Sequence, residues 1–397
     1  MPEIHFPTLL FYCQHSLGIG HLTRSFALAA ALTRQFRVVF LNGGRLPPGV
    51  QVPAGIELID LPPLGMDDGH TVVSRDRSLD VAAARTERRR LIDAAVVSTR
   101  PDVLLVELFP FGRKKFANEI LPMIRAAKRQ PKGPALIACS LRDILVDARP
   151  DQKHHDDRAR WLTDRYFDTV IVHADAGFAR LEDTFRPSRA MRTPVFHSGY
   201  VVPTRQGGSD LKRQERLLIS AGGGIVGQQL FRTVLEARAR MRLGLAMRVI
   251  AGPFLPEEHW QDLQRQGAGQ AGVELVRHVS DMVAEMRSAR ASISQCGYNT
   301  ALDIVMAGVP ALVVPYETAT ENEQRARAER LAALGAVQCL EPGALQPDAM
   351  VVAIERLLSF EPRPAALALD GAERTAQILV DCLLRLRSDT PFSRQAA

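Results

Sequence analysis

The sequence predicts an α/β protein made of two similar domains, each with a parallel sheet covered by helices. Three observations lead to this fold class. The chain has 397 residues, which is more than one hydrophobic core usually covers. Short, nearly apolar segments recur along it, each followed by a turn and a longer helical pattern, as in parallel βα units. This alternation stops once, between residues 199 and 215, and then starts again.

The first domain is expected to cover residues 1–198 and to hold six strands. Their residues are almost all apolar, which is typical of strands buried on both faces. The expected strands are Thr8–Gln14, Arg37–Leu41, Ile56–Asp60, Val103–Glu107, Ala135–Cys139 and Thr169–His173.

Residues 199–215 are rich in Gly and polar residues and are expected to link the two domains. The second domain is expected over residues 216–360. Its expected strands are Arg216–Ser220, Met247–Ala251, Glu274–Arg277, Ala291–Ile293, Ala311–Val314 and Val337–Leu340. In the remaining segment, residues 361–397, an amphipathic pattern from Asp370 to Arg387 predicts a last helix.

The charge balance gives little support to a nucleic-acid partner. The net charge is +6, but the basic residues are six Lys and 44 Arg dispersed along the chain. The densest run, Arg85–Arg90, lies in a helical pattern and is interpreted as a solvated face. A hydrophobic content of 46% and a charged content of 24% are those of a globular protein. Small ligands that carry phosphate remain compatible with this composition.

The cysteines and the N-terminus favour a cytoplasmic protein. The cysteines are odd in number, far apart and without a C-x-x-C pair, which disfavours a disulfide framework or a zinc site; they are Cys13, Cys139, Cys296, Cys339 and Cys382. The first residues carry no cationic, apolar signal pattern, and no run reaches the length of a membrane helix. Peripheral contact with a membrane stays open, as does the oligomeric state.

Functional residues are expected in the loops that follow the strands, because open α/β sheets bind ligands there. After the first strand, Gly18 and Gly20 allow a tight turn into a helix that begins near His21 and continues through Arg24. An imidazole can accept a proton from a hydroxyl nucleophile at neutral pH. His21 is therefore a candidate general base, with a capping or solvent-facing residue as the alternative.

The second domain opens with a strand followed by Gly222, Gly223, Gly224 and Gly227. These glycines satisfy G-x-G-x-x-G between a strand and a helix, which favours a phosphate or diphosphate cradle. A dinucleotide site would also need an acidic residue after the next strand, and the segment Val249–Pro253 has none. A diphosphate cradle is thus favoured over a dinucleotide site, and a purely structural turn is the alternative.

The next loops carry polar side chains at successive strand ends. Gly297 precedes a helix whose first turn holds Asn299 and Thr300, an end that favours anions. Asp303 follows one turn later and can accept two hydrogen bonds, as a ribose diol requires. Beyond the following strand, Glu323–Gln324 begins another helix and is placed to reach the hydroxyls of a sugar. Taken singly, Asp303 is equally a helix charge, and Glu323–Gln324 an exposed pair beside neighbouring arginines.

These motifs resemble a known family. Three segments are similar to the C-terminal, donor-binding half of family 28 glycosyltransferases, which include the MurG-like enzymes: Gly297–Asp303, Gly308–Pro315 and Glu321–Gln324. The loop from Ser16 to Arg24 resembles the N-terminal loop of that family. The likeness is closest to bacterial predicted glycosyltransferases with a G-x-G-H-x-x-R loop and an L-R-D-I segment, here Leu141–Ile144.

The resemblance implies the GT-B fold, in which two Rossmann-like domains face a central cleft. The first domain would bind the acceptor, with Gly18, Gly20 and Arg24 in its loop. The second would bind a nucleotide sugar, and the C-terminal helix would pack back on the first domain. The diphosphate would be surrounded by Gly222, Gly223, Gly224, Gly227, Gly297, Asn299 and Thr300. Asp303 would bind the ribose, where MurG-like proteins usually place Glu, and Glu323–Gln324 would contact the donor sugar.

The implied reaction is an inverting, metal-independent transfer of a sugar from a nucleoside diphosphate sugar to a hydroxyl acceptor, with a UDP-sugar favoured and no further cofactor. No D-x-D motif marks a metal site. His21 is the expected base, and Glu107 and Asp143 are either alternative bases or partners that orient the imidazole. The acceptor is not identified. A nucleotide-sugar 2-epimerase of the same architecture and an inactive nucleotide-sugar-binding protein are the alternatives.

Overall fold

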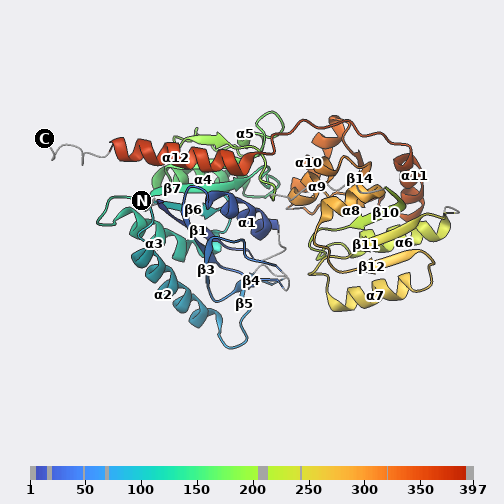
Figure 1. Ribbon diagram of the computed structural model, residues 1–397, viewed down its shortest axis with the longest axis horizontal. Coiled ribbons are helices and arrows are strands. Elements are labelled where there is room, and N and C mark those ends of the chain that lie inside the picture. Colours follow the sequence, from blue (N-terminus) through green and yellow to red (C-terminus); the bar gives the residue numbers. More distant parts are fainter. Residues whose placement is uncertain are drawn as a thin grey trace, which may run out of the picture. The chain divides into compact units, whose positions relative to one another are not determined.

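The computed structural model describes residues 6–15, 20–47, 50–67, 71–203, 213–241, 244–319 and 321–389. The chain divides into two compact units (Figure 1). Unit 1 comprises residues 1–145, 151–204 and 367–397, and unit 2 comprises residues 146–150 and 205–366. The C-terminal segment therefore belongs to the same unit as the N-terminus.

Unit 1 contains a seven-stranded sheet in which every described pair of neighbours is parallel. The strand order is β3-β2-β1-β6-β7-β8-β9. The strands are β1 (Thr8–Cys13), β2 (Arg37–Asn42), β3 (Ile56–Asp60), β6 (Val103–Glu107), β7 (Leu136–Arg142), β8 (Thr169–His173) and β9 (Val195–His197). An antiparallel pair, β4 (Leu64–Met66) and β5 (Val72–Ser74), lies apart from this sheet.

The helices of unit 1 follow the strands in the alternation that the sequence predicts. They are α1 (Gly20–Leu32), α2 (Val81–Thr99), α3 (Ala117–Lys128), α4 (Gln152–Tyr166), α5 (Leu181–Thr184) and α12 (Gly371–Asp389), with a 3-10 turn η1 (Lys114–Phe116). The six predicted strands are confirmed, three with the predicted bounds and three with shifted ends. The short strands β4, β5 and β9 were not predicted, because three-residue segments carry no readable periodicity.

Helix α12 packs into the core of unit 1 together with α1. Its inward positions recur at helical spacing, and Ala372, Ala376, Leu379 and Leu383 are buried against core residues of the sheet and α1. The segment before α12 is hydrogen-bonded to the segment that follows β9: the amide of Tyr200 donates to the carbonyl of Ala368 at 2.7 Å. The last helix is thus part of the first core.

The interpretation of Arg85–Arg90 as a solvated face is wrong at Arg88. This side chain is fully buried, because it shares the inward stripe of α2 with Ala84 and Ile92. Its guanidinium donates to Glu119 Oε1 at 2.5 Å, to Gln14 Oε1 at 2.7 Å and to the carbonyl of Gly43 at 2.9 Å. Arg88 therefore holds together the segments that follow β1 and β2, and helix α3.

Unit 2 contains a six-stranded parallel sheet in the order β12-β11-β10-β13-β14-β15. The strands are β10 (Gln214–Ser220), β11 (Ala246–Ile250), β12 (Val273–Val276), β13 (Ala289–Ser294), β14 (Ala311–Val313) and β15 (Gln338–Cys339). The helices are α6 (Gln228–Arg240), α7 (Glu257–Gly267), α8 (Met282–Ser288), α9 (Tyr298–Ala307), α10 (Glu323–Ala333) and α11 (Pro347–Leu358), with a 3-10 turn η2 (Pro342–Ala344). One core lies between the sheet and helices α6, α7 and α11. All six predicted strands are confirmed, and with them the prediction of two parallel-sheet α/β units.

Candidate functional site

In unit 1, polar side chains gather at the carboxyl end of the sheet, where helix α1 meets strand β6. Glu107 is the last residue of β6, and His21 and Arg24 lie in the first turns of α1. The Nδ1 atom of His21 is 2.6 Å from Glu107 Oε1, and Arg24 Nη2 donates to the same oxygen at 2.6 Å. The structure thus brings together His21, Arg24 and Glu107, and the contact is the one expected of a Glu107 that orients His21.

Arg113 is a fourth member of this cluster, and sequence reasoning missed it. Its Nε atom lies 3.9 Å from Glu107 Oε2. Both Leu108, directly after Glu107, and Arg113 have a positive φ, 64° and 57°. Non-glycine residues rarely adopt this conformation, and such strain is concentrated at functional sites. We call His21, Arg24, Glu107 and Arg113 the Glu107 cluster.

Burial and charge fix the protonation states in the Glu107 cluster. Glu107 is fully buried; burial alone would raise the pKa of its carboxyl, but His21, Arg24 and Arg113 outweigh this effect and lower it to about 2. Burial is also the largest effect on His21 and, with the two arginines, lowers the pKa of its imidazole to about 4 against the opposing effect of Glu107. At neutral pH the carboxylate is ionised and can only accept, so Nδ1–H of the neutral His21 donates to it. The lone pair of Nε2 is then left to accept a proton.

Two of the remaining predicted residues of unit 1, Gly20 and Asp143, are described and follow strands at this end of the sheet. Gly20 is the first residue of α1, and Gly18 lies outside the described residues. Asp143 follows the last residue of β7 directly and is fully buried. Among the three candidate bases, the structure places Glu107 in contact with His21, in the orienting position.

Two further buried histidines at this end of the sheet were also missed. His173, the last residue of β8, has Nε2 2.7 Å from Ser140 Oγ and Nδ1 3.0 Å from Ser198 Oγ. Burial lowers the pKa of His173 to about 3. His15, just after β1, has Nε2 2.9 Å from Asn42 Oδ1. Both rings are neutral structural groups at neutral pH, and no sequence motif marks them.

In unit 2, the glycine-rich loop after β10 packs directly on the loop after β11. Gly224 has a φ of +91°, and a Cβ atom there would lie 2.2 Å from the carbonyl oxygen of Ala251. A Cβ on Gly227, before α6, would lie 2.5 Å from that of Ala221. These contacts require glycine for the fold itself. Gly222 is different: it is exposed, and its nearest neighbour is the Oγ1 of Thr300, 3.6 Å from the Cβ position.

Thr300 belongs to the first turn of α9, so the glycine-rich loop and this helix end lie together. Gly297 is the N-cap of α9, no side chain caps the helix there, and nothing lies within 4 Å of its Cβ position. Asn299 is in the first turn, and the half-buried Asp303 lies one turn further along. The predicted diphosphate residues therefore form one backbone-lined group, with Asp303 beside it.

Glu323 and Gln324 are the first residues of α10, as predicted. The side-chain oxygen of Gln324 accepts from the amides of Cys296 at 3.0 Å and Tyr316 at 3.1 Å. Gln324 therefore joins the loops after β13 and β14. Its contact with a donor sugar stays a prediction, as does that of Glu323.

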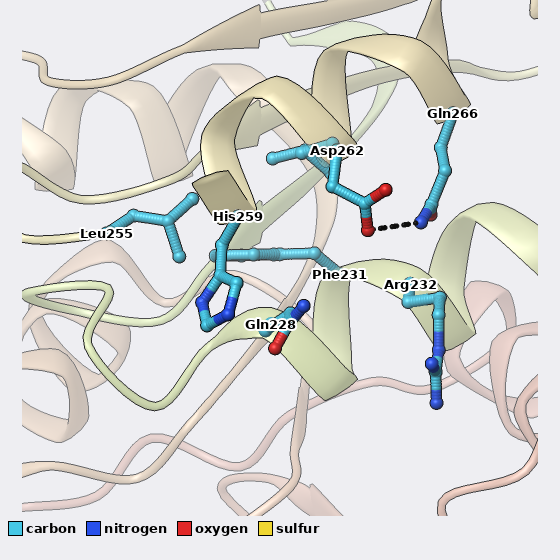
Figure 2. Close-up of a pocket in the computed structure, with 8 residues that line it drawn as sticks. Gln228, Phe231, Arg232, Leu255, His259, Asp262 and Gln266 are labelled. Carbon is cyan, nitrogen blue, oxygen red and sulfur yellow. Dashed lines mark hydrogen bonds between the residues drawn. The ribbon is translucent and has the colours of Figure 1, made fainter. Parts of the chain in front are cut away.

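A shallow hollow between α6 and α7 lies outside this group of loops (Figure 2). It is lined by side chains such as Gln228, Phe231 and His259, and on its α7 side Gln266 donates to Asp262, one turn earlier on the same helix, at 3.1 Å. The predicted donor residues are not among the residues that line it. Among the described residues, no group of three or more His, Cys, Asp or Glu is arranged to hold a metal ion.

Comparison with known proteins shows that the second half of the chain is similar to one family. Residues 218–380 match the family model described as the glycosyltransferase family 28 C-terminal domain. These residues include the glycine-rich loop, all of α9 and the start of α10. The predicted resemblance of this half to family 28 is confirmed, and the likeness of the N-terminal loop stays a prediction.

Two curated relatives carry the same name, UDP-N-acetylglucosamine--N-acetylmuramyl-(pentapeptide) pyrophosphoryl-undecaprenol N-acetylglucosamine transferase. The protein from Mesorhizobium japonicum is 34% identical over 125 residues, which cover 30% of this chain and 33% of that protein. The protein from Methylobacterium radiotolerans is 26% identical over 403 residues, which cover 96% and 98% of the two chains. The chain spans only 33%, 56% and 54% of the length of the first three relatives that it matches.

Among solved structures, the fold is similar to a UDP-glucosyltransferase from Polygonum tinctorium capable of glucosylating indoxyl. The TM-score is 0.60 at 16% identity, and 97% of this chain and 100% of that chain are covered. Together with the two parallel sheets, this likeness confirms the predicted GT-B fold. Throughout the residues that the structure describes, no helix has both the length and the apolar character to span a bilayer.

Proposed function

Residues 218–380 belong to the glycosyltransferase family 28 C-terminal domain, and from this premise we propose that the chain transfers a sugar from a nucleoside diphosphate sugar to a hydroxyl acceptor. The proposed donor is a UDP-sugar, and the anomeric configuration inverts. The observation that carries the proposal is the 2.6 Å contact between His21 and Glu107. It supplies a neutral, oriented base in unit 1, which a protein that only binds nucleotide sugars does not need.

The Glu107 cluster is suited to activate the acceptor. Nε2 of His21 accepts the proton of the acceptor hydroxyl while the oxygen attacks the anomeric carbon. The bond between that carbon and the diphosphate oxygen breaks on the opposite face, and the nucleoside diphosphate leaves. Glu107, which accepts from Nδ1–H at 2.6 Å, fixes the tautomer and stabilises the imidazolium that forms. Gly18, Gly20 and Arg24 belong to the proposed acceptor side, and Asp143 is the alternative base.

The backbone of unit 2 is suited to the leaving group. Displacement at the anomeric carbon leaves a charged diphosphate, which amide groups of a loop and a helix N-terminus stabilise without a metal ion. We assign this role to the glycine-rich loop, Gly222–Gly227, and to Gly297, Asn299 and Thr300. Asp303 is the proposed ribose ligand, and Glu323–Gln324 the proposed sugar contact.

The names of the relatives support the choice of donor. Both curated relatives are named as transferases of N-acetylglucosamine from its UDP form to an undecaprenol-linked acceptor, and this supports a UDP-sugar here. The acceptor of this chain is proposed only as a hydroxyl compound. We also propose a cytoplasmic location. Peripheral membrane contact would suit an acceptor linked to undecaprenol, as in the names of the relatives. The comparisons give the epimerase alternative no support.

A thermal-shift screen with UDP, GDP, TDP and their sugars tests the proposal, because a ligand that binds only the native state raises its stability. We expect UDP and a UDP-sugar to raise the unfolding temperature. NMR of the sugar products then separates the reactions. Free or transferred sugar with inverted configuration supports a transferase, whereas a 2-epimer formed from donor alone, or no binding of any nucleotide, contradicts it.

A further inference from the structure

Helix α10 holds both backbone groups of one residue, Cys296. Its amide donates to Gln324 Oε1 at 3.0 Å, and its carbonyl accepts from Arg327 Nη1 at 2.8 Å. Gln324 and Arg327 are three residues apart and therefore share one face of α10. Cys296 directly precedes Gly297, the N-cap of α9. Two side chains of α10 thus fix the point at which the chain enters α9.

The same contacts extend to the other loops of the proposed donor site. Gln324 Oε1 also accepts from the amide of Tyr316, which follows β14. On the other side of Cys296, Gln295 Nε2 donates to the carbonyl of Val226 in the glycine-rich loop at 2.9 Å. The loops after β10, β13 and β14 are therefore tied together through a short segment that α10 holds in place.

The burial of Arg327 sets it apart from its neighbours. Its side chain is about 1% exposed, and its guanidinium lies over the ring of Tyr298, 6.0 Å from the centroid. Arg325 on the same helix is 44% exposed and forms ion pairs with surface carboxylates. Burying a guanidinium is costly unless its donors are satisfied. The burial of Arg327 therefore indicates that the folded protein requires the contacts that this side chain makes.

We propose that Arg327 and Gln324 are positioning residues of the donor site. They hold Cys296 so that the first turn of α9 faces the glycine-rich loop, where the amides of both meet the diphosphate of the donor. This inference rests on the proposed function. Gln324 then has a positioning role in addition to the predicted sugar contact, and Arg327 has a role that the sequence alone did not suggest.

Loss of the hydrogen bond from Arg327 to the Cys296 carbonyl is expected to weaken the binding of the second phosphate of UDP in particular. The Arg327→Gln variant removes the charge that holds the Cys296 carbonyl, which loosens the start of α9. We expect UDP to bind about tenfold more weakly, as for one lost charge-assisted hydrogen bond, with much less change for UMP. The preference for UDP over UMP therefore falls. A role in general stability alone would weaken both ligands alike.

Calorimetric titration of UDP and of UMP into the full chain tests this expectation. Arg325→Gln is the matched control, and it should bind both ligands as the wild type does. Arg327→Lys keeps a charged donor and should fall between the wild type and Arg327→Gln. An unchanged ratio of UDP to UMP affinity in Arg327→Gln would overturn the inference.

Hydrogen exchange of the ligand-free chain separates the inference from the proposed function. Amides of residues 294–300 should exchange faster in Arg327→Gln and in Arg327→Lys than in Arg325→Gln, while the rest of unit 2 keeps its protection. Equal exchange in all variants would overturn the inference even if UDP binds. If the wild type binds no nucleotide, the proposed function fails, whereas the exchange result still decides whether α10 holds this segment. Should Arg327→Gln not fold, Arg327→Lys provides both measurements.

Discussion

The two candidate sites of this chain are built from different parts of the polypeptide. In unit 1 the site consists of side chains: a buried carboxylate, Glu107, contacts His21 and Arg24, with Arg113 3.9 Å away. In unit 2 the site consists mainly of backbone, with a glycine-rich loop against the first turn of α9. The first arrangement depends on charge and protonation, and the second on chain geometry. The proposed division into proton transfer and diphosphate binding follows this difference.

The largest effect is expected from removing the imidazole of unit 1. The His21→Ala variant should lower kcat about 10³-fold, since general base catalysis typically contributes about 10² to 10⁴. Sugar transfer followed by NMR measures this change. The exposed His154 on α4 provides the control, and His154→Ala should retain full turnover. Turnover of His21→Ala close to that of the wild type would remove His21 from the role of base.

The next effect concerns the buried charges of unit 1. The Arg88→Met variant leaves the Glu119 carboxylate buried without its cationic partner and should lower the free energy of unfolding by about 3 kcal/mol. Urea denaturation followed by circular dichroism measures it. Arg90 in the same run is exposed and pairs with Glu87 on the surface, so Arg90→Met should change stability by less than about 1 kcal/mol. Equal effects of the two variants would contradict the buried role of Arg88.

A smaller effect is expected from the glycine-rich loop of unit 2. Gly224→Ala forces a side chain into a φ of +91° and toward the Ala251 carbonyl, and should cost about 1–3 kcal/mol of stability. Gly269 has open space around its Cβ position, so Gly269→Ala is the control and should be nearly neutral. Thermal unfolding compares the two variants. If Gly224→Ala were as stable as Gly269→Ala, the glycine-rich loop would not require glycine at position 224.

The smallest effect is a pH dependence carried by unit 1. The pKa of His173 is about 3 in the folded chain, whereas an unfolded histidine has a pKa near its ordinary value of 6.5. The unfolded state therefore binds more protons below that value, and stability falls as the pH drops. Between pH 7 and pH 5 this histidine contributes a loss of about 2 kcal/mol in the free energy of unfolding. Lowered pKa values of His15 and His21 act in the same direction.

Denaturation at the two pH values, with the wild type and with His173→Gln, measures this contribution. The variant lacks the titrating ring and should lose less stability on acidification than the wild type. An identical loss in both proteins would show that His173 does not titrate as its burial implies.

The features that sequence reasoning found are those encoded locally. The alternation of apolar strands and helical patterns gave both sheets, and G-x-G-x-x-G between a strand and a helix identified the loop in which Gly224 must be glycine. The likeness to family 28 located α9 and the start of α10. Each of these signals lies within a few neighbouring residues.

The features that it missed or left open depend on residues distant in the chain. Glu107 was expected either to act as a base or to orient His21, and because 86 positions separate the two residues, no local pattern decides between these roles. Arg113 joins them through a loop with unusual backbone conformation. Arg88 was interpreted as part of a solvated face and Arg327 was assigned no role, because helical periodicity does not tell which arginine finds buried acceptors. Tertiary packing decides these positions.

In the proposed function, unit 2 holds the donor and His21 takes no part in holding it. Calorimetric titration of UDP into the wild type, His21→Ala and Asp303→Ala tests this division. We predict equal affinity for the wild type and His21→Ala, and about tenfold weaker binding by Asp303→Ala, which loses the proposed contact with the ribose. Weaker binding by His21→Ala with unchanged binding by Asp303→Ala would contradict the division between the two units.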